Sequence, residues 1–346
     1  MSQQALTDLW FGIVALFWAG YLFLEGFDFG VGMLLPVLGR EPRARSAMVG
    51  SIGPFWDGNE VWLIVAIGAT FAALPGWYAT LLAAGYGVFF IALVALIVRA
   101  VSFEFRGKGS AVWRRWWDRA LIAGSLVPPL AWGLILTAQL SGLPINAQGT
   151  FSGRPWNLLG ALPVLGAVTL TVLCVVHGAT YLCLRVTDPL AARARRMATL
   201  VWGPAVVLLC AFFGSLLATS SEARSHGALS YVAPAVSLLA LVAALLLHLV
   251  RRDRLAFAAT GVAVLGYVAT LFVGLFPNAV VSSLSAHDNL TAVDAASGHY
   301  TLTVMTIVAV IFAPIVLAYQ AWTYWVFRRR LSSEPVPSRP AVADKT

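Results

Sequence analysis

Nine long apolar runs follow one another along the 346-residue chain, separated by shorter polar connections. A helix needs about 20 consecutive apolar residues to cross a bilayer. The pattern predicts an all-α polytopic membrane protein with nine transmembrane helices, at 9–38, 57–74, 78–101, 120–139, 157–184, 198–217, 231–250, 255–276 and 301–327. Residues 1–331 are expected to form a single transmembrane domain. The Pro-containing segment 332–346 is expected to be a disordered cytoplasmic tail.

Composition agrees with a membrane protein. Hydrophobic residues make up 60% of the chain and charged residues 11%, whereas a soluble domain has about 25% charged residues. Residues 1–8 carry no Lys or Arg and no cleavage site is evident, so we expect no removable signal peptide. The three cysteines lie in apolar runs without a CxxC spacing, which favours buried apolar side chains over a disulfide or a metal site.

The basic residues alternate between connections. All but two of the 23 Lys and Arg residues lie in every second connection or near the C-terminus, and the exceptions are Arg154 and Arg224. Because Lys and Arg in short loops stay on the cytoplasmic side, this predicts an outer N-terminus and a cytoplasmic C-terminus. Topology therefore accounts for the formal charge of +8, and nucleic-acid binding is not expected.

A faint internal repeat is visible when Gly26 is aligned with Gly178. Each glycine lies in the inner half of a long apolar run that is followed by an Arg-rich connection. A duplication in which 157–276 repeats 9–139, with 301–327 as an added helix, fits this likeness. Chance similarity over so few residues explains it equally well.

Two carboxylates stand inside the first apolar run. Glu25 and Asp28 are three positions apart and therefore share one helix face. An ionisable group inside a membrane helix is costly unless it is paired, neutralised or hydrated, and such groups usually mark an ion or proton route. We interpret both as parts of a proton pathway. A buried acid that is hydrogen-bonded to a neighbouring helix or held at a subunit interface is the alternative.

Three further carboxylates, Asp57, Glu60 and Glu104, are expected at a similar depth on the cytoplasmic side, with Arg99 as their ion-pair partner. We interpret them as parts of the same proton pathway. Simpler interpretations stay open, because Asp57 could cap a helix with Glu60 completing a capping box. Glu104 could likewise form a surface ion pair with Arg99 or Arg106.

The remaining candidate residues favour structural roles. Only His177 and His248 lie in predicted helices, where a membrane haem b would need axial imidazoles. His177 is better explained as a hydrogen-bonded core residue, and His248, beside the basic end of its helix, as an interfacial one. Gly30 and Gly32 lack the Lys and the strand of a phosphate loop and favour close helix packing. No catalytic triad, metal-ligand cluster or nucleotide motif is evident, so the chain alone is not expected to be a complete catalyst.

Three motifs carry a family resemblance. Gly-Phe-Asp-Phe-Gly-Val-Gly stands at 26–32, Trp-Asp-Gly-Asn-Glu-Val-Trp at 56–62, and an Arg/Phe/acid/Phe/Arg segment at 99–106. Further matches lie at 124–129, 178–182 and 302–306, so the likeness covers nearly the whole chain. In these motifs the chain closely resembles subunit II of the cytochrome bd-type quinol oxidases.

The resemblance implies two four-helix bundles plus one peripheral helix, in the bacterial cytoplasmic membrane. It implies an obligate heterodimer with a subunit I that carries two haems b and one haem d, and that oxidises quinol and reduces dioxygen to water in aerobic respiration. Glu25, Asp28 and Asp57 match acids that the family associates with proton delivery from the cytoplasm, although some relatives have Asp at the first position. A structural quinone in this subunit, membrane lipid and a small accessory subunit are further implied partners.

Two other classes of function remain. A free-standing proton-coupled secondary transporter would use Glu25 and Asp28 as its coupling site. Transporters usually show broken helices at the binding site and matched repeats, and Gly30 and Gly32 could supply such a break. A purely structural membrane partner is the third interpretation.

Overall fold

The computed structural model describes residues 1–332, and the predicted tail at 333–346 lies outside the described residues. The described chain is almost entirely helical, which confirms the all-α class. The main helices are α1 (Gln3–Leu38), the short α2 (Pro42–Ile52), α3 (Trp56–Ala73), α4 (Pro75–Phe105), α5 (Ala111–Ser141), α6 (Ala161–Arg185), α7 (Leu190–Thr219), α8 (Leu229–Leu249), α9 (Asp253–Leu275) and α11 (His299–Val326). The connections hold η1 (Pro155–Leu158), η2 (Glu222–Arg224), β1 (Asn278–Val280), η3 (Ala286–Asp288), β2 (Leu290–Thr291) and α10 (Ala292–Ala295).

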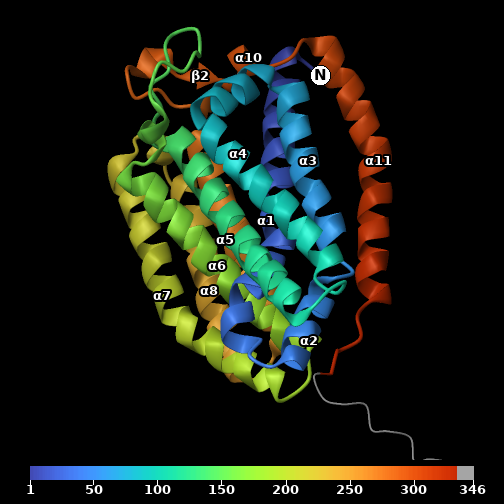
Figure 1. Ribbon diagram of the computed structural model, residues 1–346. Coiled ribbons are helices and arrows are strands. Elements are labelled where there is room, and N and C mark those ends of the chain that lie inside the picture. The colour runs from blue at the N-terminus through green and yellow to red at the C-terminus, as the bar shows by residue number, and fades with distance from the viewer. Residues whose placement is uncertain (333–346) are drawn as a thin grey trace, which may run out of the picture.

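Eight helices in the described part of the chain are long and apolar enough to cross a membrane, namely α1, α4, α5, α6, α7, α8, α9 and α11. The second predicted span corresponds to α3, which is not among these eight. Its first turns carry Asp57, Asn59 and Glu60, and these polar residues lower its mean hydropathy. α3 nevertheless packs alongside α1 and α4 in the body of the molecule (Figure 1).

α2 lies where the apolar pattern predicts only a connection. Pro42 opens this helix at a position where the missing N–H is not needed. Ala44, Met48 and Ile52 recur at helical spacing and are buried, so the helix packs one face against the protein. The segment is too short and too polar to cross a bilayer, and for that reason a search for long apolar runs misses it.

α1 is the central element of the fold. It packs against α3 and α5 on one side and against α6 and α9 on the other. α4 packs on α3 and α5, and the remaining helices form the close pairs α6 with α7 and α8 with α9. α11 packs chiefly along α1 and α3 and forms one edge of the molecule (Figure 1). Its membrane-spanning stretch is only 6% buried.

Glycines allow α1 to approach its neighbours closely. A Cβ atom on Gly30 would overlap the backbone oxygen of Cys174 in α6, and one on Gly178 would overlap the backbone of Gly30. A Cβ on Gly32 would overlap the side chain of Ser125 in α5. Backbone contact of this kind is typical of membrane helices with small residues at their crossing. The close packing predicted for Gly30 and Gly32 is therefore confirmed.

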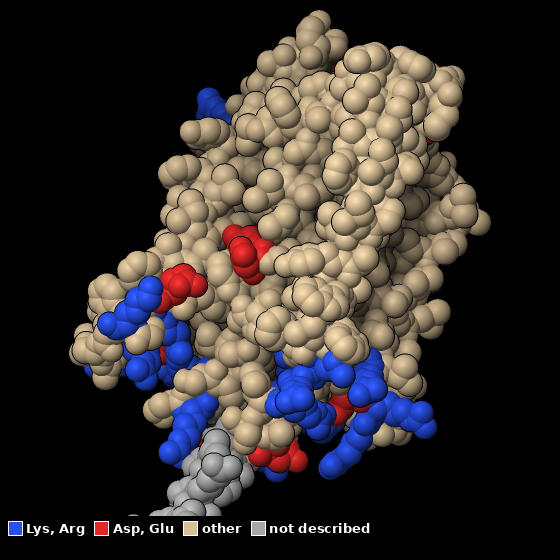
Figure 2. All heavy atoms as spheres, turned by 90° about the vertical axis from the view of Figure 1, so that its right-hand side faces the viewer, with Lys and Arg blue, Asp and Glu red and all other residues tan. Residues whose placement is uncertain are grey.

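The two ends of the molecule differ. At one end, backbone hydrogen bonds link the α5–α6 and α9–α11 connections. The N–H of Leu143 donates to the backbone oxygen of Val281, and the N–H of Val281 donates to that of Gln139, each at 2.9 Å. β1 and β2 pair antiparallel beside them. Most of the Lys and Arg side chains on the face carrying α11 gather at the opposite end (Figure 2). A basic end and an end of ordered polar loops fit a bilayer between them.

Candidate functional site

A buried ion pair joins α1 to α4. The guanidinium of Arg99 is paired with the carboxylate of Glu25, and both side chains have no exposed surface. Arg99 Nη1 also lies 3.7 Å from Oε2 of Glu60, whose side chain is 20% exposed. The Arg99 guanidinium carbon lies 4.9 Å from the ring centre of Phe29 and 5.5 Å from that of Phe103, so aromatic faces surround the cation. One arginine therefore holds two carboxylates from different helices at the core of the protein.

A second group centres on Asn59 in α3. Its Nδ2 donates to Oδ2 of Asp28 at 2.7 Å and to the backbone oxygen of Leu24 at 3.2 Å. Its Oδ1 accepts from Nε2 of Gln320 at 3.0 Å and from the hydroxyl of Tyr324 at 2.7 Å. The amide thus ties Asp28 in α1 to two side chains of α11, and it is itself fully buried.

Several polar atoms in these two groups have no hydrogen-bond partner within the described residues. They are Oε2 of Glu25, Oδ1 of Asp28, Oε2 of Glu60, and Nε and Nη2 of Arg99. Buried polar atoms are nearly always paired with protein or ordered water. The cluster therefore keeps capacity for further hydrogen bonds, which a site that passes protons between carboxylates and water requires.

Asp57 and Glu104 do not join the buried cluster. Both are exposed, and neither side chain makes a hydrogen bond or an ion pair within residues 1–332. The N-cap of α3 is Phe55, with no side-chain capping bond, so the interpretation of Asp57 as a helix cap is wrong. α3 begins at Trp56, so Asp57 lies inside the first turn of the helix. There the negative charge of Asp57 interacts favourably with the positive end of the helix dipole.

The alternative interpretation of Glu104 as part of a surface ion pair is also wrong. Arg99 is turned inward to Glu25, and Nε of Arg106 instead lies 2.7 Å from Oδ1 of Asp118 in α5. Nη1 of Arg45 in α2 binds the other carboxylate oxygen of Asp118, also at 2.7 Å. Asp118 therefore links the basic ends of three helices, a role that its position among arginines in the sequence did not reveal.

His177 and His248, the two histidines in the predicted helices, make hydrogen bonds with protein atoms. Nδ1 of His177 lies 2.7 Å from Oγ1 of Thr260, and its Nε2 lies 3.2 Å from the backbone oxygen of Phe23. His177 is therefore a hydrogen-bonded core residue, as predicted. His248 is only 2% exposed, and its Nε2 lies 3.2 Å from Oγ1 of Thr199. His248 is thus buried against α7 in the last turn of α8.

These donor groups do not fit a haem or a metal ion. Both ring nitrogens of His177 are already bound, so an axial imidazole pair with His248 would break existing contacts. In the described residues, no group of three or more His, Cys, Asp or Glu side chains could hold a metal ion. No chemical step is therefore assigned to a haem ligated by this chain.

Sequence reasoning missed Asn59, Gln320 and Tyr324. Asn59 lies between Asp57 and Glu60 in one of the motifs that carry the family resemblance. A side-chain amide at the start of an apolar run was the available signal that Asn59 could bind a buried acid. Gln320 was a similar signal within the last apolar run, but nothing in the sequence showed that the first and last long helices meet.

Comparison with known proteins places the chain among respiratory membrane proteins. The sequence model of the family described as cytochrome bd terminal oxidase subunit II matches residues 6–327. Cytochrome bd ubiquinol oxidase subunit 2 of Bacillus subtilis is 39% identical over 336 residues, covering 96% of this chain and 99% of that protein. Cytochrome bd-I ubiquinol oxidase subunit 2 of Escherichia coli K12 is 31% identical over 372 residues, covering 97% and 98%.

A solved structure shows the same fold. A chain of the bd oxidase from Geobacillus thermodenitrificans aligns with a TM-score of 0.74 over 93% of this chain and 98% of that one. The sequence identity in that alignment is 18%, so the likeness concerns the fold alone.

Proposed function

Because the chain belongs to the cytochrome bd terminal oxidase subunit II family, we propose that it scaffolds a haem-bearing subunit I and supplies carboxylates to a proton path from the cytoplasm. It is a multi-pass protein of the bacterial cytoplasmic membrane and a subunit of an oxidoreductase complex. Within that complex, quinol is oxidised and dioxygen is reduced to water. Each water formed consumes protons, which must cross low-dielectric protein to reach the oxygen-reducing site.

The observation that carries the proposal is a graded series of carboxylates. Asp57 and Glu104 are exposed, Glu60 is 20% exposed, and Glu25 and Asp28 are fully buried. Asp57 and Glu104 collect protons at the surface, and Glu60 passes them to the buried acids through water. A positioned acid–base group of this kind accelerates a proton transfer by about 10²–10⁴-fold.

Arg99 is a positioning residue in this scheme. A guanidinium cannot release its proton, so it does not carry protons itself. Its charge instead lowers the cost of holding Glu25 and Glu60 at the centre of the membrane protein. Oε2 of Glu25 and Oε2 of Glu60 accept no hydrogen bond within the described residues, so each can accept one from water.

The redox groups belong to the partner in this proposal. Two haems b and one haem d, bound in subunit I, supply electron transfer and oxygen chemistry. His177 binds Thr260 and Phe23, and His248 binds Thr199, which agrees with that division of labour. A structural quinone and a small accessory subunit remain part of the proposal on family likeness alone.

We further propose nine membrane crossings arranged as two four-helix bundles, α1 with α3–α5 and α6–α9, plus the peripheral α11. The N-terminus and the start of α11 lie at one end of the molecule, and α11 ends at the other (Figure 1). A chain whose two ends lie on opposite sides of a membrane must cross it an odd number of times. Eight helices within residues 1–332 qualify by length and hydropathy, so we assign the ninth crossing to α3. The basic end then faces the cytoplasm.

The transporter interpretation is less well supported. α1 runs as one continuous helix from Gln3 to Leu38, through both Gly30 and Gly32. Coupling sites in transporters are typically formed where a membrane helix is broken. The glycines of α1 instead form the contacts with α5 and α6.

Quinol-driven oxygen consumption by the purified two-subunit complex tests the proposal. We expect Glu25→Gln to lower turnover by about 100-fold, as for the loss of a proton-transfer group, while the haem absorption bands remain. Asp57→Asn should give a smaller loss, because other surface groups can replace an exposed collector. Loss of the haem bands with Glu25→Gln would demote Glu25 to a structural residue, and unchanged turnover in both variants would refute the proton path.

A further inference from the structure

A cavity of about 1090 Å³ opens at the basic end of the molecule, among α1, α6, α9 and α11. Its inner wall is aromatic and is formed by Phe23, Phe27, Phe55, Tyr181, Phe257 and Tyr324. Ligand pockets in proteins usually measure about 300–1,000 Å³, so this cavity is large enough for a sizeable molecule. The acidic cluster lies outside it, and neither Glu25 nor Asp28 lines its wall.

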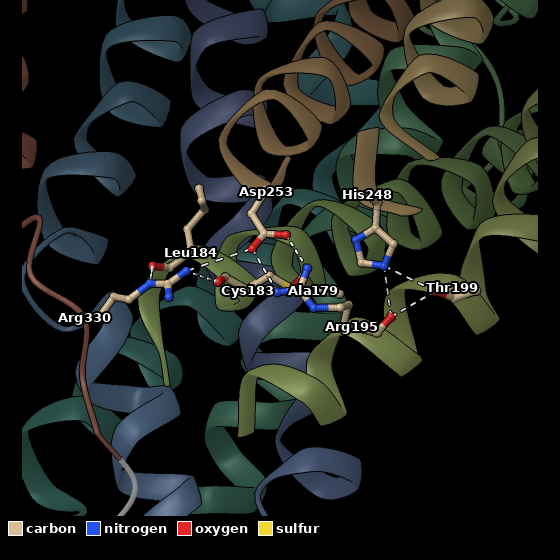
Figure 3. Close-up of polar contacts among 8 residues, drawn as sticks. All are labelled: Ala179, Cys183, Leu184, Arg195, Thr199, His248, Asp253 and Arg330. Atoms are coloured by element: carbon tan, nitrogen blue, oxygen red, sulfur yellow. Dashed lines mark hydrogen bonds and ion pairs between the residues drawn. The ribbon is translucent and has the colours of Figure 1, made fainter. Parts of the chain in front are cut away.

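The mouth of the cavity is strongly basic. Six arginines line it, namely Arg185, Arg251, Arg252, Arg254, Arg328 and Arg330, against the single carboxylate of Asp253. That carboxylate is already bound by Arg195 from α7 through both of its oxygens (Figure 3). Arg330 reaches the same carboxylate at 4.0 Å and donates to the backbone oxygens of Cys183 and Leu184 (Figure 3). Little negative charge therefore remains for the other arginines.

Four of the six arginines at the mouth keep capacity to bind a ligand. Arg251, Arg252 and Arg254 are exposed and make no ion pair within the described residues. Arg185 is deeper, since only 8% of it is exposed, and its Nε has no hydrogen-bond partner. Its guanidinium carbon lies 5.2 Å from the ring centre of Phe55, so the cation lies against the aromatic wall. The unpaired Nε of Arg185 is a buried donor on a cation, and such a group binds a phosphate oxygen strongly.

We propose that this cavity binds one anionic phospholipid, with its phosphate group on the arginines and the start of its acyl chains along the aromatic wall. Charge complementarity supports an anionic headgroup, because six arginines surround the mouth and their only carboxylate is taken. The amphipathic lining supports a lipid rather than a free anion. Basic pockets between membrane helices on the cytoplasmic side are suited to such headgroups.

The site also connects to α11. Phe55 stacks on Tyr324 with ring centres 4.5 Å apart, and the Tyr324 hydroxyl donates to Asn59. Arg328 and Arg330 follow α11 directly and line the same cavity. A lipid bound here would hold the basic end of the peripheral helix against α6 and α9, which otherwise make few contacts with it. The proposal does not depend on the proton path.

Native mass spectrometry of the purified complex tests the site. The complex is delipidated in detergent and titrated with phosphatidylglycerol, with phosphatidylcholine and with inorganic phosphate. We expect one tightly retained phosphatidylglycerol. Each basic residue near an anionic lipid contributes roughly a fivefold gain in affinity. The triple variant Arg251→Gln/Arg252→Gln/Arg254→Gln should therefore weaken phosphatidylglycerol binding by about 100-fold.

The matched control is Arg114→Gln/Arg115→Gln/Arg119→Gln, which removes the same charge from exposed arginines of α5 that do not line the cavity. It should retain the lipid. Equal lipid binding by both triple variants would overturn the proposal, as would retention of a quinone in the lipid's place or binding of inorganic phosphate as tight as that of the lipid. If the first triple variant fails to assemble, its three single variants should each show a roughly fivefold loss.

Discussion

At the scale of single residues, Arg99 determines what the buried acids can do. It is fully buried, pairs with Glu25 and lies within 3.7 Å of Glu60. The sequence predicted Arg99 as the ion-pair partner, because it ends an apolar run at the depth of the acids. It could not predict Asn59 as the partner of Asp28, since that contact depends on how α1, α3 and α11 pack. Packing also left Asp57 and Glu104 at the surface.

Removal of Arg99 alone should destabilise the complex. Arg99→Leu leaves Glu25 buried without its cation, and breaking a buried ion pair costs about 3–5 kcal/mol. The double variant Arg99→Leu/Glu25→Leu should recover most of that loss, because an apolar pair of similar volume is often neutral. Thermal unfolding of the purified complex measures both. A double variant as unstable as the sum of the two single variants would show that the pair is not coupled.

At the scale of elements, α1 organises the fold through its glycines. The apolar runs predicted the long helices because membrane length and hydropathy are properties of the sequence itself. They did not predict α2, which is short and polar, or the hydrogen-bonded joining of the α5–α6 and α9–α11 connections. The close crossing of α1 and α6 could be anticipated from glycine spacing, but its partner residues could not.

Gly30→Ala should separate α1 from α6. Its new methyl group would overlap the backbone of Cys174 and Gly178, neither of which can rotate away. Overpacking in a tight core costs about 1–3 kcal/mol, so the melting temperature of the complex should fall and less subunit I should copurify. Gly12→Ala in the same helix is the control, because nothing lies within 4 Å of its new Cβ. Equal melting temperatures for the two variants would contradict this packing account.

At the scale of the whole molecule, charge separates the two ends. Most basic side chains on the face that carries α11 gather at one end (Figure 2). Six arginines line the cavity at the basic end. The sequence predicted this asymmetry from its alternating connections. It could not show that six arginines from separate segments converge on one cavity, because they are brought together only when α6, α9 and α11 pack.

The proposed topology can be tested with reporter fusions. Alkaline phosphatase, active only outside the cytoplasm, should be active when fused after Leu74, between α3 and α4, and inactive when fused after Arg43 in α2. A fluorescent protein fused after residue 332 should be fluorescent in the cytoplasm. Phosphatase inactive at both of the first two sites would show that α3 does not cross the membrane, leaving eight crossings.

We propose that Glu60, Glu25 and Asp28 deliver protons to the partner subunit. The most direct measurement is proton uptake during an oxygen pulse, followed with a pH-indicating dye on the cytoplasmic side of the reconstituted complex. We predict that Glu60→Gln and Glu25→Gln slow proton uptake at least tenfold while haem content is unchanged. Glu41→Gln, which removes an exposed carboxylate between α1 and α2, should have no effect. Proton uptake at the wild-type rate in Glu60→Gln and Glu25→Gln would contradict the account.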